Sequence, residues 1–151
     1  MCIRDRSRTG YVICIANCPV VWVSKLQTDI ALSTMEAEYS ACSMSMRDVL
    51  PLLYLTQILF SGIGMDKESP VLIKTTVWED NNALKLATME PGRMTPRSKH
   101  YAVKYHWFRS HLAPNKIMIM KIASDDQKAD MFTKALRHTK FIKNRKLTMG
   151  W

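Results

Sequence analysis

Two short apolar runs near the start of the chain predict a β-hairpin. Residues 10–16 and 19–24 are rich in Val, Ile, Tyr and Trp, and the turn-forming stretch NCP separates them. Runs of this length and composition, bounded by turn residues, are typical of paired strands. Residues 1–6, MCIRDR, have no periodicity and resemble a translated sequencing-library end, so we interpret them as an artefactual tail outside the fold.

A long helix is predicted from Ser33 to about Phe60. Ser33 and Glu36 form the S-x-x-E pattern of a capping box, in which side chains satisfy backbone amides at the start of a helix. Pro51 lies inside this helix. Because proline has no amide hydrogen, we expect a kink there, or a division into two helices.

The rest of the chain alternates between strand and helix patterns. The predicted elements are a strand at 71–78, a short helix starting near Asp80, a helix over about 100–112, a strand at KIMIMKIA, and a last helix to about Leu136 that starts with a second capping box, Ser124 and Gln127. This order predicts an α/β fold, a mixed sheet with flanking helices, formed by one domain over residues 7–151.

The charge of the chain favours a polyanionic partner. There are 22 Lys and Arg against 13 Asp and Glu, a formal net charge of +9, so nucleic acid is the leading class of partner. No run approaches the ~18 apolar residues of a membrane span, and no signal peptide is evident, so we expect an intracellular protein without a membrane partner. The four cysteines form no CxxC pair, which argues against zinc and favours buried reduced thiols.

Two glutamates near the start of the long helix have different surroundings. At ~100° per residue, Glu36 and Glu38 point to nearly opposite faces. We expect Glu36 to share a solvated face with Tyr39 and Ser43. Glu38 shares its face with small or apolar residues, so its carboxylate should point toward the sheet, where it needs a cation, a metal or a donor. A glutamate at the helix edge that reaches water is the alternative.

Two aspartates are further candidates, each with a structural alternative. Asp80 follows a predicted strand, where ligands collect at the carboxyl ends of strands in open α/β sheets, but it could equally cap a helix. Asp130 lies in the last predicted helix. With Lys134 at i+4 and Arg137 at i+7, a solvated ion pair would also account for it.

Four segments stand in a fixed order along the chain: SKLQTDIALSTMEAEYSAC, EDNNALKLA, PRSKHYAVKYHWFR and DDQKADMFTKAL. In this order and spacing they resemble the ribonuclease H domain at the end of the Pol polyprotein of copia-type LTR retrotransposons. The resemblance runs from about residue 7 to the C-terminus. It implies a ribonuclease H-like fold with a five-stranded mixed sheet, and hydrolysis of the RNA strand of RNA–DNA hybrids during reverse transcription.

The resemblance also implies a metal site and partners. By position in the family's motifs, Glu38, Asp80 and Asp130 would be the catalytic residues and the ligands of Mg²⁺. Two such ions ~3.5–4 Å apart can activate a water and stabilise the leaving oxygen of a phosphodiester. The implied partners are an RNA–DNA hybrid and the reverse transcriptase portion of the same polyprotein. The residues do not distinguish a cytoplasmic virus-like particle from the nucleus.

A basic stretch between the second and third motifs is the expected nucleic-acid-binding region. Its candidate residues are Arg93, Arg97, Lys99, His100, Lys104 and Arg109. They interleave with aromatic side chains, a mix suited to phosphate and base contacts. The alternatives are that the basic residues form an ordinary solvated helix surface and that Trp107 and Phe108 belong to the core.

The chain departs from the family pattern at its start. The family begins with a strand that carries a first metal-binding aspartate just before the stretch that TGYV resembles, and only Asp5 precedes TGYV here. The resemblance therefore implies that the first strand is missing, and we expect an inactive fragment of the enzyme. A non-catalytic nucleic-acid-binding remnant of a transposon is the alternative. An unrelated basic interaction module is a third hypothesis.

Overall fold

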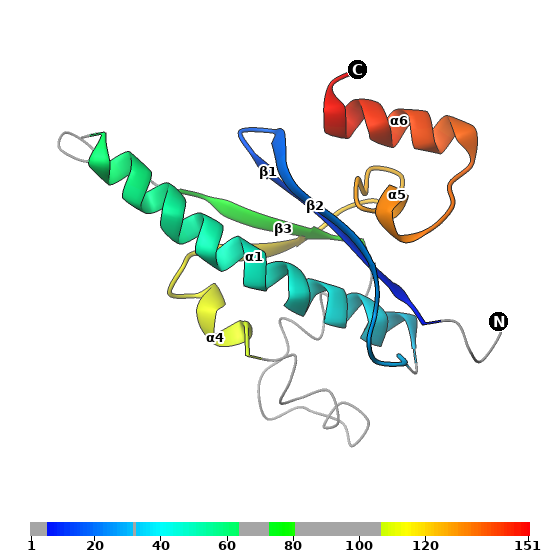
Figure 1. The fold of residues 1–151 in the computed structure, drawn as a ribbon, viewed down its shortest axis with the longest axis horizontal. Helices are drawn as coiled ribbons and strands as arrows, with labels where there is room; N and C mark the ends of the chain where they lie inside the picture. Colours follow the sequence, from blue (N-terminus) through cyan, green and yellow to red (C-terminus); the bar gives the residue numbers. More distant parts are fainter. Residues whose placement is uncertain (1–5, 32, 64–72, 81–106) are drawn as a thin grey trace.

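The computed structural model describes residues 6–31, 33–63, 73–80 and 107–151. Helices and strands alternate along these residues (Figure 1), which confirms the predicted mixed α/β class. The elements are β1 (Arg8–Ile15), β2 (Cys18–Leu26), α1 (Thr34–Gly62), β3 (Thr75–Glu79), α4 (Arg109–Leu112), β4 (Ile117–Lys121), α5 (Asp130–Thr133) and α6 (His138–Met149). The predicted helix after Asp80 and residues 100–106 of the next predicted helix lie outside the described ranges.

The predicted hairpin is confirmed, but its turn lies at Ala16 and Asn17, because Cys18 and Pro19 of the predicted NCP turn belong to the second strand. Strands β1 and β2 pair antiparallel, with Ile15 opposite Cys18. The two residues between the strands, Ala16 and Asn17, have φ angles of 50° and 64°, in the left-handed region. A two-residue loop with positive φ at both positions matches the twist of the flanking strands, which explains the short turn.

The described strands form two separate pairs. Strands β3 and β4 are parallel, and no hydrogen-bonded ladder joins them to the β1–β2 hairpin within the described residues. Thr75 lies opposite Ile117, and Glu79 lies opposite Lys121. Both pairs lie beside α1 (Figure 1). Because no ladder joins the two pairs, the described strands do not form the single five-stranded sheet that the resemblance implies.

Helix α1 starts as predicted but is not divided. The hydroxyl of Ser33 accepts a hydrogen bond from the backbone N–H of Glu36 at 3.1 Å, which confirms the cap. The helix then runs 29 residues through Pro51, so the expected division is wrong (Figure 1). Pro51 and Arg47 are both exposed, so water can reach the carbonyl of Arg47, which proline leaves unbonded.

Among the described residues, no helix is long and apolar enough to cross a membrane.

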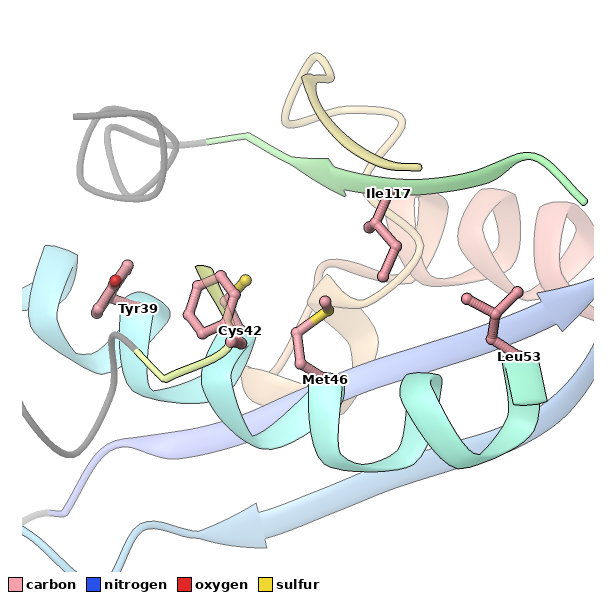
Figure 2. Packing of buried hydrophobic residues seen from close by; sticks show 6 residues of the cluster. Tyr39, Cys42, Met46, Leu53 and Ile117 are labelled. Carbon is pink, nitrogen blue, oxygen red and sulfur yellow. The ribbon is translucent and has the colours of Figure 1, made fainter. Parts of the chain in front are cut away.

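The hydrophobic core lies between α1 and the β3–β4 pair. Figure 2 shows side chains from one side of α1 pointing toward β4, where Ile117 lies. The buried cluster consists of Tyr39, Cys42, Met46, Leu53, Phe108 and Ile117. Since the α1 members recur every three to seven residues, they line one stripe of the helix.

Helix α1 is buried on more of its surface than the sequence suggested. Tyr39 and Ser43 are almost fully buried, so the expected solvated face is wrong. The segment before α4 covers them: the Tyr39 and Phe108 rings lie 5.6 Å apart, and Trp107 Nε1 donates to Ser43 Oγ at 2.9 Å. Phe108 is fully buried, which favours its core alternative over a nucleic-acid contact.

The hairpin has a helix on each face. On one face, the Tyr11 hydroxyl donates to the Asp48 carboxylate of α1. On the other, Ser24 Oγ donates to the backbone carbonyl of Phe132 in α5 at 2.6 Å. Gly10 faces α5, because a Cβ built on it would lie 2.9 Å from the backbone carbon of Phe132. Adjacent residues of β1 therefore point to opposite faces of the hairpin, Gly10 toward α5 and Tyr11 toward α1, as expected for a strand.

The C-terminal region differs most from prediction. Residues 124–126 form a turn, and α5 is a single turn starting at Asp130. The second capping box is therefore wrong: Gln127 Nε2 instead donates to the Trp78 carbonyl of β3 at 3.1 Å. Helix α6 was not predicted, although Gly150 after its end, with φ of 82°, is a typical helix stop signal.

Substitution of Gly10 tests the packing of α5 on the hairpin. Gly10→Ala would press a methyl group against the Phe132 backbone, so the free energy of unfolding should fall by about 1–3 kcal/mol. Urea unfolding followed by circular dichroism measures it. Gly62→Ala is the control, since no atom lies within 4 Å of the added Cβ, and it should change stability by less than about 1 kcal/mol. Equal effects would contradict this packing.

Candidate carboxylate site

An open cleft of about 960 Å³ lies among the hairpin, α1, β3 and the segment that leads into α5. Glu38, Asp80 and Asp130 all line it. They come from three elements that are far apart in sequence: the start of α1, the end of β3 and the start of α5. The three carboxylates singled out in the sequence therefore face one cleft.

Glu38 reaches the cleft because of its helical face. Ala41 and Ser45, on the same side of α1, line the cleft too, whereas Glu36 does not. The backbone of this turn is held in place by Gln27, a buried residue whose Nε2 donates to the Ala37 carbonyl at 2.7 Å. The prediction that Glu38 rather than Glu36 points inward is confirmed.

Bonds between the end of β3 and the segment after β4 connect the regions that carry Asp80 and Asp130, and both residues line the cleft. The backbone N–H of Ile122 donates to the Glu79 carbonyl at 3.0 Å. The Gln127 side chain donates to the preceding residue of β3, at the Trp78 carbonyl. These two bonds fix the chain on either side of the turn that leads to Asp130. Asp80, directly after Glu79, is half-buried and lines the same cleft.

Asp130 is buried and is paired with two lysines. The residue is 6% exposed. Its Oδ1 lies 2.9 Å from Lys134 Nζ, and its Oδ2 lies 2.9 Å from Lys140 Nζ. The ion pair with Lys134 that the sequence offered as an alternative is therefore present, but around a buried carboxylate rather than a solvated one. The second partner is Lys140 of α6. This partner was not predicted, because the sequence pattern did not indicate a separate helix there.

The chemistry of these groups fits a hard cation. Carboxylates from three elements face the cleft, and Mg²⁺ prefers oxygen ligands. The Lys140 ammonium already shows that oxygens here hold positive charge: it lies 2.9 Å from both Asp130 Oδ2 and the Ser124 carbonyl oxygen. In the described ranges, however, no three acidic, His or Cys side chains stand close enough together to enclose a metal.

Within the described ranges, none of the basic candidates is found at this cleft. Five of them lie outside these ranges: Arg93, Arg97, Lys99, His100 and Lys104. Arg109 is the first residue of α4, is half-buried and does not line the cleft. It lies near the Tyr39 ring, whose pKa is raised by burial although the charge of Arg109 acts in the opposite direction.

Relatives of this chain are retrovirus-related Pol polyproteins from plant transposons. The chain is 31% identical over 136 residues to the one from transposon TNT 1-94 of Nicotiana tabacum, and 27% identical over 135 residues to those from transposons RE1 and RE2 of Arabidopsis thaliana. These matches cover 89–90% of this chain but only 9–10% of each relative. The chain therefore spans about a tenth of the length of these curated relatives.

The other comparisons give no further assignment, since no family model and no solved structure matches the chain. The relatives confirm the predicted link to retrotransposon Pol polyproteins. The ribonuclease H domain, its metal and its hybrid substrate stay predictions at this point.

Cys42 offers a test of burial at the wall of the cleft. Burial, and secondarily the nearby charge of Glu79, raises the pKa of the Cys42 thiol to about 12, so the thiolate becomes the main form only above that pH. Cys18 is exposed, so the expectation of buried thiols is wrong there. At pH 8, iodoacetamide should modify Cys42 at least about tenfold more slowly than Cys18.

Mass spectrometry of the folded chain gives both alkylation rates. In urea the rates of Cys42 and Cys18 should converge, because unfolding removes the difference in burial. Equal rates in the folded chain would show that Cys42 is accessible and would contradict the described packing of α1.

Proposed function

We propose that this chain is a ribonuclease H-type part of a retrotransposon Pol polyprotein, which hydrolyses the RNA strand of RNA–DNA hybrids during reverse transcription. The observation that carries the proposal is that Glu38, Asp80 and Asp130 line one cleft although they come from separate elements. The relationship to Pol polyproteins supports it independently of the site.

In this proposal the three carboxylates would hold Mg²⁺. When bound, two Mg²⁺ ions would supply an activated water and stabilise the leaving 3′ oxygen. The chain's own contribution would be to bring negative side chains from α1, β3 and α5 to the same cleft, and to keep the Asp130 carboxylate oriented by cations on both of its oxygens. Carboxylates that face one cleft repel one another, which would favour cation binding there.

The charge and the relatives support the proposed substrate and the proposed neighbouring partner. A net charge of +9 suits a hybrid whose phosphates it would neutralise, so binding should weaken steeply as salt is raised. The reverse transcriptase portion of the same polyprotein is the proposed covalent neighbour. The family pattern also includes an aspartate ahead of the stretch that TGYV resembles, and the cleavage experiment below adds a strand that carries it.

A non-catalytic nucleic-acid-binding remnant is the second candidate. Two observations favour it. Both oxygens of Asp130 are engaged by lysine ammonium groups, and the described residues contain no closed set of metal ligands. Under this candidate the chain would bind hybrids through its basic residues, and the acidic residues would serve stability alone.

Cleavage of a labelled RNA–DNA hybrid in Mg²⁺ separates the two candidates. The comparison is between this chain and one extended upstream through an aspartate-bearing strand. We expect only the extended chain to cut, and both chains to bind the hybrid at low salt. If neither cuts while both bind, the binding remnant is the correct function.

Substitutions in the extended chain test the three carboxylates. Glu38→Gln, Asp80→Asn and Asp130→Asn should each lower the cleavage rate by about a hundredfold or more, because each removes part of the charge that holds the metal. Glu36→Gln, two positions away on α1 and outside the cleft, is the matched control and should cut normally. Circular dichroism checks that each variant folds. An equal loss in Glu36→Gln would argue against this site.

A further inference from the structure

The Lys140 ammonium is surrounded by oxygen atoms next to Asp130, one of the carboxylates that line the cleft. It donates to Asp130 Oδ2 and to the Ser124 carbonyl, each at 2.9 Å, and it lies 3.7 Å from Asp125 Oδ1. The Lys140 pKa is raised, first by the hydrogen bond to Asp130 and then by the charges of Asp130, Asp125 and Asp80. The charges of two of the three proposed metal ligands, Asp130 and Asp80, therefore act on the Lys140 ammonium.

We infer that Lys140 is a resident counter-ion of the carboxylate cleft, which positions Asp130 when no metal is bound and competes with a divalent cation for the same oxygens. Lys140 is thus a positioning residue. The inference rests on the proposed function, because it assumes that the same carboxylates bind a divalent cation. It goes further by assigning a role to α6, which none of the sequence motifs contains.

The physical reason lies in the burial of Asp130. A carboxylate that is 6% exposed is costly unless cations or donors meet it, and Lys134 and Lys140 meet one oxygen each. The two lysines differ in what else they contact. Lys134 is one helical turn from Asp130 and its side chain is 56% exposed, whereas Lys140 comes from another helix and also binds the Ser124 carbonyl. Lys140 is therefore the cation that is built into the site.

A divalent cation that approaches Asp130 meets this positive charge. To bind Oδ2 it must displace the Lys140 ammonium or share the carboxylate with it. In either case the lysine lowers the affinity of the cleft for the metal by charge repulsion. Removal of the ammonium should therefore strengthen metal binding, whereas loss of a purely structural contact would weaken binding or leave it unchanged.

Helix α6 has other attachments that do not depend on Lys140. Lys143 Nζ lies 2.8 Å from Asp126 Oδ1, and the fully buried Asn144 donates through Nδ2 to the Gln127 carbonyl at 3.0 Å. A variant at position 140 should therefore keep α6 in place. Lys143 also provides a matched control: it is one turn further along the same helix, and its ion pair with Asp126 is half-exposed on both sides.

The test is a titration of the full chain with Mn²⁺ alone at low salt, with free Mn²⁺ followed by electron paramagnetic resonance. Lys140→Met should bind Mn²⁺ roughly three- to tenfold more tightly than the unsubstituted chain. Lys140→Arg keeps the charge and should bind as the unsubstituted chain does. Lys143→Met should stay within about twofold, because an exposed charge is screened by solvent.

The outcomes separate failure of this inference from failure of the proposed function. If the unsubstituted chain binds Mn²⁺ and Lys140→Met binds it equally or more weakly, Lys140 is a structural tie and the inference is wrong, while the metal site stands. If neither chain binds Mn²⁺, the inference is wrong for this chain, and the same titration of the chain extended upstream decides whether the metal site of the proposed function is wrong as well. Lys140→Gln, which can still donate to Asp130, replaces Lys140→Met if thermal melts show that the latter does not fold.

Discussion

The packing of α1 against both strand pairs is the constraint on which the rest of the structure depends. No backbone ladder joins the β1–β2 and β3–β4 pairs in the described residues, so side chains of α1 connect them. Asp48 accepts a hydrogen bond from Tyr11 on the hairpin side, and Met46 packs in the core with Ile117 of β4. Because Glu38 belongs to the same helix, its position in the cleft follows from this packing.

Charge balance around Asp130 is the second organising feature. A strongly basic chain places two lysines on one buried carboxylate, and both Asp130 and Lys134 line the cleft that other acidic groups line. If the proposed nuclease function holds, the carboxylate oxygens of Asp130 are kept in position by the protein's own ammonium groups before a metal binds. This arrangement also explains why ion-pair and metal-ligand interpretations of Asp130 are compatible: the residue makes an ion pair in the structure, and metal binding would be an exchange of cations.

Local sequence signals predicted the elements that are fixed locally. The hairpin follows from two β-rich runs and a short turn, and the start of α1 follows from the Ser33 cap, since both depend on neighbouring residues alone. Glu38 could be chosen over Glu36 from helical geometry. The predictions that were wrong concern residues whose surroundings depend on long-range contacts. Gln127 bonds β3 instead of capping a helix, and burial of Tyr39 requires the aromatic segment before α4.

The placement of the three carboxylates, likewise, could be predicted only in part from the sequence. The inward direction of Glu38 could be argued from its helix face, but the fact that it lines the same cleft as Asp80 and Asp130 depends on how distant elements pack. Lys140 could not be predicted as a partner of Asp130, because the chain must turn between α5 and α6 to bring them together. The family resemblance named the three acidic residues, whereas the two lysines between which Asp130 lies became evident only in three dimensions.

Paramagnetic broadening by Mn²⁺ in the ¹⁵N NMR spectrum would test the central claim, that the three carboxylates form one cation site, most directly. At a small fraction of an equivalent of Mn²⁺, amide signals around Glu38, Asp80 and Asp130 should broaden together and before others, and excess Mg²⁺ should restore them. Broadening confined to the exposed Asp125 and Asp126 turn, or scattered over the acidic surface, would contradict a common site.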